Sequence, residues 1–206
     1  MNNLFELVLV DPNEELCSEL EKHFIGLEKV KVVNGKFQDI ENWDCVISPG
    51  NSFGIMDGGF DLLLLKLFGK EIQRKVQANI FMYHAGLQPV GTSHIVELNN
   101  IKHPFVAYTP TMLHPMPING TINVFLSMKA ALQSIQIHND NGGGKNKKFI
   151  NKVICPGLGT ATGRVPYSVA AYQMRLAYDL FFNTPKKMDW DLVRQIVKKM
   201  SGGQHA

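Results

Sequence analysis

The sequence predicts an α/β protein, a three-layer α/β/α sandwich around a mixed, mostly parallel central sheet. Short apolar runs typical of buried strands alternate with longer segments of helical periodicity along the chain. Two of the strand-like runs lead through glycine-rich loops into helices. The 206 residues are 45% hydrophobic and 19% charged, which is enough apolar material for one buried core.

The first half of the chain supplies three strands and a long helical segment. Asp11 and Pro12 are expected to cap and open a helix after the first strand, because Asp accepts hydrogen bonds from free N–H groups and proline fits a first helical turn. Residues 61–82 predict one long helix. Gly69 inside it costs about 1 kcal/mol relative to alanine, so any break is expected there. The strands are predicted over residues 4–10, 30–33 and 45–48.

The second half continues the alternation. Strands are predicted over residues 94–98, 105–108 and 152–155. Helices are predicted over residues 121–137, 166–182 and 189–200, the second of them opened by Pro166. No linker divides two cores, so residues 1–183 are expected to form one domain, with the helix and tail of residues 184–206 packed on it. The polar stretch 139–148 is expected to be a surface loop.

The composition and charge of the chain limit the classes of ligand and cellular location that are expected. The net charge of +3 suits an anionic small ligand but is too weak a signal to indicate nucleic acid. No apolar run approaches the roughly 20 residues of a membrane-spanning helix, and no basic signal region is seen, so a cytoplasmic protein without a membrane partner is expected. The three cysteines and seven histidines show no metal-binding spacing, so core thiols and neither metal nor cofactor are expected.

The segment after the third strand suits a phosphate. Residues 48–60 have the sequence SPGNSFGIMDGGF, between a buried strand and an apolar helix. In open α/β sheets, ligands bind where strands end and loops enter helices. Glycine lets backbone N–H groups approach a ligand without a Cβ in the way, and a helix N-terminus adds partial positive charge. Taken alone, the segment is equally consistent with a tight turn at Gly58-Gly59.

A second loop of this kind follows the strand at 152–155. Its sequence is PGLGTATGRVP, with glycines at 157, 159 and 163. Two such loops in one small domain suggest two walls around a polyphosphate. Neither is a standard nucleotide signature, because the Gly-Lys-Ser/Thr of a P-loop is absent and Gly163 lies one residue too far from Gly159 for a dinucleotide fingerprint.

At these loops the sequence resembles the macro domain family. The family's first loop joins a strand ending in Asn, through a short spacer, to Gly-Gly and an acidic residue entering a helix, and residues 46–51 and 56–61 resemble it. Its second loop is a glycine- and threonine-rich turn followed by Gly-x-Pro and an alanine-rich helix, which residues 157–171 resemble. Both motifs occur in order, and the Asp57-Gly58-Gly59 variant looks like a divergent, macro-like branch.

The resemblance implies that the ligand and partner is ADP-ribose or an ADP-ribosylated substrate. It implies that Asn51 holds the distal ribose hydroxyls and that Gly58 and Gly59 lie beside the diphosphate. Valine at Gly58 or Gly159 is therefore expected to abolish binding in a protein that still folds. The ligand-binding residues implied are Asn51, Gly54, Asp57, Gly58, Gly59, Phe60, Gly157, Leu158, Gly159, Thr160, Ala161, Thr162 and Gly163.

The sequence also departs from the family. Ser48 stands where the family has the first Asn of the strand-end pair. The adenine-binding Gly-Asp-Ile of the family appears as residues 35–40, which leaves open whether Asp39 or another residue contacts the adenine. Phe37 either stacks on a base or packs in the core.

Two functions follow from the resemblance. One is an enzyme that hydrolyses a group on the distal ribose, of the ADP-ribosyl hydrolase or ADP-ribose 1″-phosphate phosphatase type; the alternative is a non-catalytic module that binds ADP-ribose. Catalysis is assigned to Asp57, Asn51 and His114. Asp57 is expected to act as a general base or to shape the turn, because a carboxylate without such a use would only repel a diphosphate. His114 either assists catalysis or is an exposed loop histidine.

Overall fold

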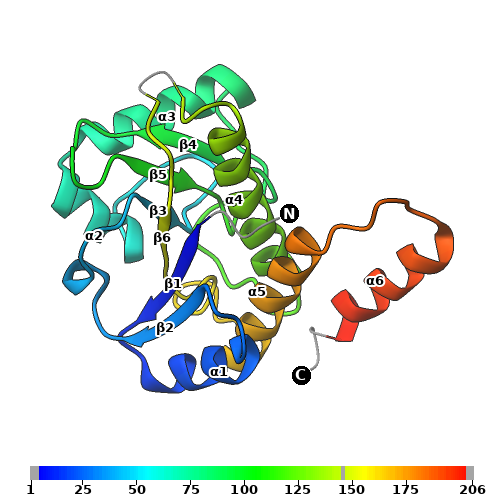
Figure 1. The fold of residues 1–206 in the computed structure, drawn as a ribbon. Helices are drawn as coiled ribbons and strands as arrows, with labels where there is room; N and C mark the ends of the chain where they lie inside the picture. Colours follow the sequence, from blue (N-terminus) through cyan, green and yellow to red (C-terminus); the bar gives the residue numbers. More distant parts are fainter. Residues whose placement is uncertain (1–4, 145–146, 203–206) are drawn as a thin grey trace.

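The structure, a computed structural model, describes residues 5–144 and 147–202. Within them, strands are interspersed with helices along the whole chain (Figure 1). The strands are β1 Glu6–Asp11, β2 Val30–Asn34, β3 Cys45–Ser48, β4 His94–Glu97, β5 Phe105–Tyr108 and β6 Lys152–Cys155. The helices are α1 Glu14–Phe24, α2 Gly59–Phe68, α3 Glu71–His84, α4 Asn123–Asp140, α5 Tyr167–Phe182 and α6 Trp190–Gly202, with a 3₁₀ turn, η1, at Phe37–Asp39.

The six strands form one sheet in the order β2-β1-β6-β3-β5-β4. Neighbouring strands are parallel except β4 and β5, which are antiparallel. In the centre, Val46 of β3 is paired with Ile154 of β6, and Ile47 with Ala107 of β5. Because β1, β6, β3 and β5 run in the same direction, their carboxyl ends meet at one edge of the sheet. The predicted mixed, mostly parallel sheet is confirmed.

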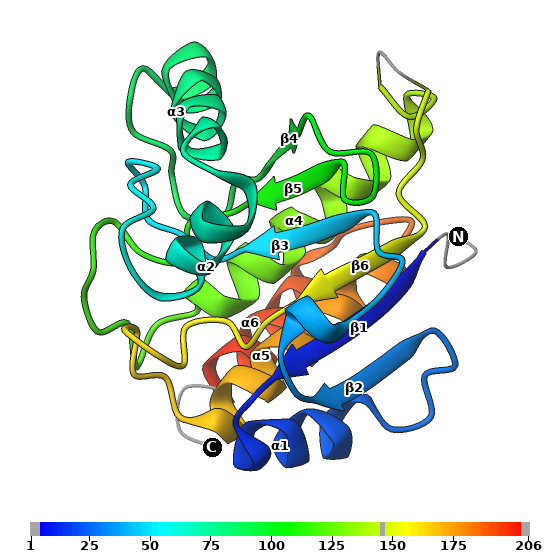
Figure 2. The ribbon, with the colours of Figure 1, turned by 90° about the vertical axis from the view of Figure 1, so that its left-hand side faces the viewer.

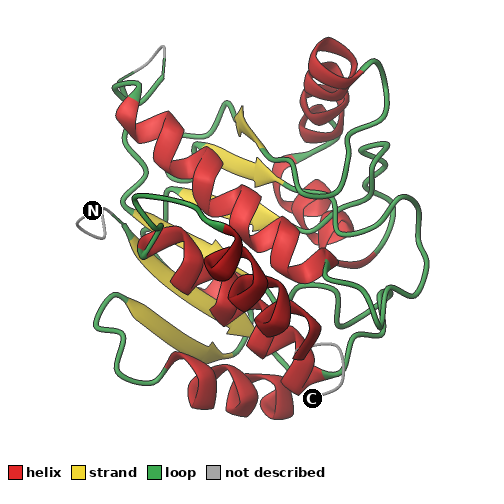
Figure 3. Cartoon of the chain, turned by 90° about the vertical axis from the view of Figure 1, so that its right-hand side faces the viewer, coloured by secondary structure: helices red, strands yellow, loops and turns green. Residues whose placement is uncertain are grey.

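Helices cover both faces of the sheet. Helices α1, α4 and α5 enclose the larger core cluster on the face seen in Figure 3, and α2 and α3 enclose a smaller cluster on the opposite face, which is seen in Figure 2. Every residue of β3 and β5 is buried, with Ile47 in the larger cluster and Val46 in the smaller one. Burial on both faces explains why these strands are continuous apolar runs. The predicted three-layer sandwich is confirmed.

The predicted helix over residues 61–82 is two helices, α2 and α3. They separate at Gly69, whose φ of 78° lies in the left-handed region that glycine tolerates best. The Gly69 N–H donates to the Leu65 carbonyl at 2.9 Å and so closes α2. The helix therefore breaks at Gly69, the position at which a break was predicted. The apolar residues Ile72, Val76 and Ile80 of α3 are buried against the sheet.

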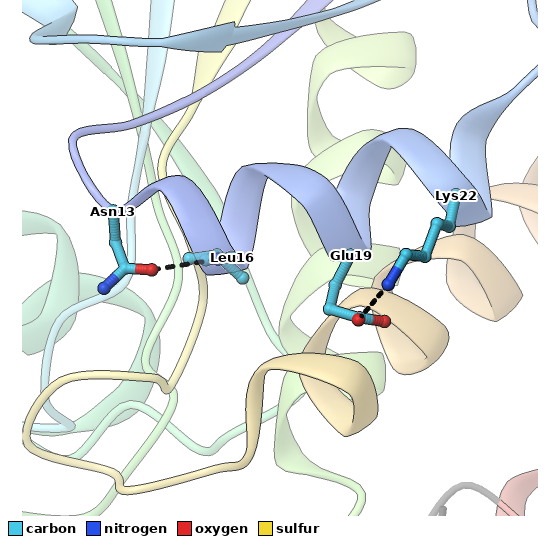
Figure 4. A network of polar contacts seen from close by, with 4 residues as sticks. All are labelled: Asn13, Leu16, Glu19 and Lys22. Atoms are coloured by element: carbon cyan, nitrogen blue, oxygen red, sulfur yellow. Dashed lines mark hydrogen bonds and ion pairs between the residues drawn. The ribbon is translucent and has the colours of Figure 1, made fainter.

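The predicted start of the first helix is wrong by two residues. Asp11 ends β1, and Asn13 is the capping residue of α1. The Asn13 Oδ1 atom accepts a hydrogen bond from the Leu16 N–H at 2.9 Å, and Glu19 pairs with Lys22 later in the helix (Figure 4). The Asp11 Oδ1 atom instead accepts from the Asn13 N–H at 2.9 Å. Both residues are good caps, and the geometry of the strand end decides between them.

The stretch 139–148 is only partly a loop, because α4 continues to Asp140. The Asn139 side chain donates to the Ile150 carbonyl and accepts from the Ile150 N–H, both at 2.8 Å, which ties the end of α4 to the chain entering β6. At the C-terminal side, Met200 of α6 packs against the larger core cluster, and the Tyr172 hydroxyl donates to the Lys199 carbonyl at 2.9 Å. These contacts attach α6 to the domain.

The three cysteines are free and buried, as expected of core thiols, and burial raises the pKa of Cys45 and Cys155. None of the helices in the described ranges is both long and apolar enough to cross a membrane.

Candidate functional site

A cleft opens at the carboxyl ends of β3, β5 and β6 (the edge toward which their arrows point in Figure 2). Its space, including the mouth, is about 750 Å³. Three segments enclose it: the first loop together with the first turn of α2, residues 49–61; the second loop, residues 156–166; and the third loop, residues 109–122. The residues that line it are Pro49, Gly50, Asn51, Ile55, Asp57, Gly58, Gly59, Phe60, Asp61, Thr111, Met112, Pro115, Gly157, Gly159, Ala161, Thr162 and Gly163.

Asn51 shapes the first loop. Its Nδ2 donates to the Ile55 carbonyl at 2.7 Å, and its Oδ1 accepts from the Phe53 N–H at 3.1 Å. The buried Tyr108 hydroxyl donates to the Asn51 carbonyl at 2.8 Å and accepts from the Asn51 N–H at 3.1 Å. Asn51 also forms an isolated bridge to Met112 of the third loop. The first loop is therefore held on the end of β5 and against the third loop.

The entry into α2 presents unpaired backbone donors to the cleft. Gly58 is the N-cap residue and makes no side-chain cap hydrogen bond, and Gly59 follows with a left-handed φ of 54°. No N–H of residues 57–61 donates a hydrogen bond to any group in the described ranges. A Cβ on Gly58 or Gly59 would have no protein atom within 4 Å. These glycines thus leave the N–H groups and the space beside them open.

The second loop is fixed at its ends and unpaired in its middle. The Gly157 N–H donates to Asp11 Oδ2 at 3.3 Å, and the Val165 N–H donates to the Gly159 carbonyl at 3.0 Å. The Gly163 carbonyl accepts from the Ile118 N–H at 2.8 Å, which joins this loop to the third loop. Between these anchors, the N–H groups of residues 158–163 donate no hydrogen bond within the part of the chain that the structure describes.

Asp61 is a site residue that the sequence analysis missed. It is 5% exposed, lines the cleft, and accepts a hydrogen bond from the Ser48 hydroxyl. Burial raises the pKa of the Asp61 carboxyl to about 7; the Ser48 hydrogen bond opposes this shift and the negative charge of Asp57 adds to it. Burial, followed by the nearby Asp61 charge, also raises the pKa of Tyr108 well above its usual range.

Ten of the residues expected to bind the ligand line the cleft, and four of the candidate residues do not. Leu158 is fully buried in the larger core cluster, and Gly54 lies against Val76 and Ile80. Thr160 and His114 are also outside the lining. The His114 ring is exposed, and its Nδ1 lies 3.2 Å from the Pro115 carbonyl oxygen. The catalytic and ligand-binding roles of the whole set stay predictions.

The Asp57 carboxylate is exposed and lines the cleft. It accepts no hydrogen bond from any group within residues 5–144 and 147–202, so no contact there supports the turn-shaping role. The carboxylate is therefore accessible to a ligand or a water molecule, as the general-base role requires.

Phe37 packs in the core and not at the cleft, so of the two alternatives, stacking on a base or packing in the core, the structure has the second. It is 4% exposed in the smaller cluster, and its ring centroid lies 4.8 Å from that of Phe60. Phe60 itself lines the cleft and is partly buried. Asp39 is exposed on η1 and does not line the cleft.

The cleft contains two carboxyl groups, and no Lys, Arg or His is among the residues that line it. Arg164 is near in sequence but exposed outside the lining. Within the described ranges, no group of three or more His, Cys, Asp or Glu side chains converges as a metal site would. An anion in this cleft would therefore be held by backbone N–H groups and by the N-terminus of α2.

Comparison with known proteins places these features in a family. The family described as "macro-like domain" matches residues 27–202. An uncharacterized protein of Aquifex aeolicus (strain VF5) is 30% identical over 145 residues, which are 70% of this chain and 78% of that protein.

Several solved structures have a similar fold. The macrodomain of Mycobacterium tuberculosis DarG has a TM-score of 0.55 at 14% identity, over 70% of this chain and 86% of that one. A variant of the Oceanobacillus iheyensis macrodomain with ADPR has a TM-score of 0.58 at 13% identity, over 95% and 94%. A Trypanosoma brucei macrodomain in complex with ADP has a TM-score of 0.53 at 10% identity, over 96% and 68%. At these identities the likeness is one of fold.

Proposed function

The chain belongs to the macro-like domain family, and on that premise we propose that its cleft binds ADP-ribose, with the diphosphate between the first and second loops. The observation that carries the proposal is the pair of unpaired N–H runs, residues 57–61 and 158–163, in the two loops that line one cleft. Two phosphates offer several acceptor oxygens to such donors. Each charge-assisted hydrogen bond contributes roughly 1.5–3 kcal/mol.

The relatives support this ligand. Macrodomains of Oceanobacillus iheyensis and Trypanosoma brucei that share the fold were solved with ADP or ADPR bound. Asn51 is proposed to contact the distal ribose. Its Nδ2 already donates to the Ile55 carbonyl and its Oδ1 already accepts from the Phe53 and Ile55 N–H groups, so a ribose hydroxyl would accept from its remaining N–H.

A second proposal is hydrolysis of a group attached to the distal ribose, with Asp57 as the general base. The supporting observation is that the Asp57 carboxylate lines the cleft and accepts no hydrogen bond in the described ranges. A free carboxylate can orient and deprotonate a water molecule. Asn51 would orient the ribose, and His114 would need to leave Pro115 to assist. If Asp57 has no such role, the domain is a binding module only.

The charges of the cleft favour an uncharged substituent. A 1″-phosphate would add negative charge to a cleft that already holds Asp57 and Asp61 and is lined by no cation. Like charges a few ångströms apart repel by roughly 4 kcal/mol or less near a protein surface. The ADP-ribosyl hydrolase type, with a neutral ester or glycosyl link, is therefore proposed ahead of the phosphatase type.

Binding is tested by isothermal titration calorimetry and thermal shift with ADP-ribose. A ligand that binds only the folded state raises the melting temperature. AMP and ribose 5-phosphate should bind more weakly, because each carries only part of the diphosphate. The absence of both heat and thermal shift at millimolar ADP-ribose would reject the proposed ligand.

Hydrolysis is tested by incubating the protein with ADP-ribose esters and with the 1″-phosphate, and identifying products by mass spectrometry. Asp57→Asn keeps the size of the side chain and removes the base, so it should bind ADP-ribose and release little or no product. Asp140→Asn, an exposed position outside the cleft lining, is the matched control. If Asp57→Asn retains the wild-type rate, the base assignment is wrong. If the wild type releases no product from any substrate, the binding-module alternative holds.

A further inference from the structure

The cleft presents an electrostatic conflict. The proposed ligand carries two negative charges on its diphosphate, and the lining contains the carboxyl groups of Asp57 and Asp61 and no cationic side chain. Asp57 is exposed, so water screens its charge. Asp61 is 5% exposed, and its Oδ1 accepts from Ser48. A carboxylate as buried as Asp61 is screened much less.

The groups that face Asp61 do not neutralise it. Ser48 at the end of β3 is its hydrogen-bond donor, Tyr108 at the end of β5 interacts with it electrostatically, and the negative charge of Asp57 in the first loop disfavours its ionised form. A Cβ on Gly50 would lie 2.6 Å from Asp61 Oδ2 and would overlap the Tyr108 hydroxyl, so Gly50 passes directly against both groups.

The cationic side chains of α2, α3 and the second loop are not among the residues that line the cleft. Lys75 of α3 donates to the Glu97 carbonyl at 2.9 Å, and Arg74 pairs with Glu71 at 3.4 Å. Lys66 of α2 and Arg164 of the second loop are outside the lining, as is His114. None of them offsets a second negative charge beside the diphosphate.

We propose that Asp61 takes up a proton from solvent when ADP-ribose binds, so that the cleft receives the diphosphate with Asp61 as a neutral carboxylic acid. This inference rests on the proposed function, because it concerns the same cleft. In the neutral form, Asp61 adds no charge beside the phosphates and gains an O–H that can donate a hydrogen bond.

Burial raises the pKa of Asp61 to about 7 in the free protein, so proton uptake near neutral pH requires only a small further rise. A bound diphosphate nearby disfavours the carboxylate further, so the pKa is higher in the complex. Between these two values the complex holds more protons than the free protein, and affinity must fall as pH rises. About one pH unit or more below the pKa of the free protein, Asp61 is protonated before the ligand binds, and the affinity no longer changes with its titration.

Ser48 is a positioning residue in this scheme. Its hydroxyl donates to Asp61 and favours the carboxylate, which lowers the pKa against the effect of burial. Without that donor the Asp61 pKa rises, and the pH above which affinity falls moves upward. A residue that only supported the loop would change affinity at every pH alike.

The test is calorimetric titration of ADP-ribose into the full chain from pH 6 to 9, in buffers with different ionisation enthalpies. The diphosphate stays fully ionised throughout this range. We expect uptake of about half a proton per ligand at pH 7, approaching one at pH 8, and an affinity that falls about fivefold from pH 7 to pH 8 and nearly tenfold from pH 8 to pH 9. Binding with no proton uptake and constant affinity would overturn the inference and leave the proposed ligand intact. No binding at any pH would overturn both.

Two variants identify the group. Asp61→Asn mimics the neutral acid, so it should bind without proton uptake, with an affinity that is flat above pH 7 and close to the wild-type value at pH 6. Ser48→Ala should keep the uptake and shift its onset to higher pH. If Asp61→Asn does not fold, Ser48→Ala decides alone: an unchanged onset would contradict the assignment to Asp61. Proton uptake that persists in a folded Asp61→Asn variant would also contradict it.

Discussion

The two glycine-rich loops that enclose the cleft look alike in sequence and use their glycines differently. In the first loop, a Cβ on Gly58 or Gly59 would meet no protein atom within 4 Å. In the second loop, a Cβ on Gly159 would lie 2.8 Å from Val124, and one on Gly163 would lie 2.5 Å from the Gly159 carbonyl oxygen. The space beside Gly58 and Gly59 is open to a ligand, whereas the space beside Gly159 and Gly163 is filled by other atoms of the protein.

This difference shows when a glycine in a loop is evidence for a ligand-binding site. Both loops leave backbone N–H groups unpaired toward the cleft. The second loop achieves this by a turn so tight that side chains at 159 and 163 have no space, while the first achieves it at an open helix N-terminus. A glycine therefore indicates a ligand directly only where its missing Cβ would point into the cleft.

The largest effect is expected for Gly159→Val. The position has a left-handed φ of 72°, and its Cβ would overlap Val124 and crowd Ile118. Overpacking and left-handed backbone together should cost about 3 kcal/mol or more of unfolding free energy. Thermal unfolding should show a melting temperature lower by roughly 6–12 °C.

That outcome would modify the expectation that valine at Gly159 affects only ligand binding. The expectation treated both loops as ligand-facing, whereas a Cβ on Gly159 would crowd Val124 and Ile118, so a cost in stability is expected as well. A Gly159→Val protein with the wild-type melting temperature would show that the second loop relaxes easily, and the contrast between the loops would be lost.

Gly58→Val should do the opposite. Gly58 has an extended backbone, with φ −148°, that valine adopts readily, and its Cβ would extend into open cleft. We expect a melting temperature within a few degrees of the wild type, and an affinity for ADP-ribose at least about a hundredfold weaker, or roughly 2.7 kcal/mol. Calorimetry on the folded variant measures this. Undiminished affinity would mean that the glycine only makes a turn.

The smallest effect is expected at Gly59, where space is open but the backbone is left-handed, with φ 54°. Alanine there should cost about 1 kcal/mol of stability, and asparagine less, because asparagine tolerates this conformation better. Chemical denaturation of the two variants separates backbone strain from side-chain bulk. Equal stability of Gly59→Ala and wild type would remove conformation as a reason for this glycine.

The sheet was predictable because its strands are buried on both faces. The strands at 45–48, 105–108 and 152–155 have the predicted bounds, since a continuous apolar run bounded by polar or glycine residues leaves little choice. The break at Gly69 was predictable for a local reason. The capping residue of α1 was not, because Asp11 and Asn13 are equally good caps and the end of β1 decides between them.

The candidate site was predictable only in part. The composition of the two loops located the cleft, because in open α/β sheets ligands bind where strands end and loops enter helices. Asp61 was missed because an acid in the first turn of a helix is ordinary in sequence. Only the contacts with Ser48 and the packing of Tyr108 and Gly50, from other parts of the chain, show that it is buried. Its position before four leucines was the one available signal.

The central claim is that the backbone N–H groups of both loops bind the diphosphate. The most direct measurement is a titration of ¹⁵N-labelled protein with ADP-ribose, followed by amide chemical shifts. The account predicts the largest shifts in residues 58–61 and 158–163, with smaller ones on the far side of the sheet, for example in α6. Saturable binding with those amides unmoved, or shifts confined to one loop, would contradict it.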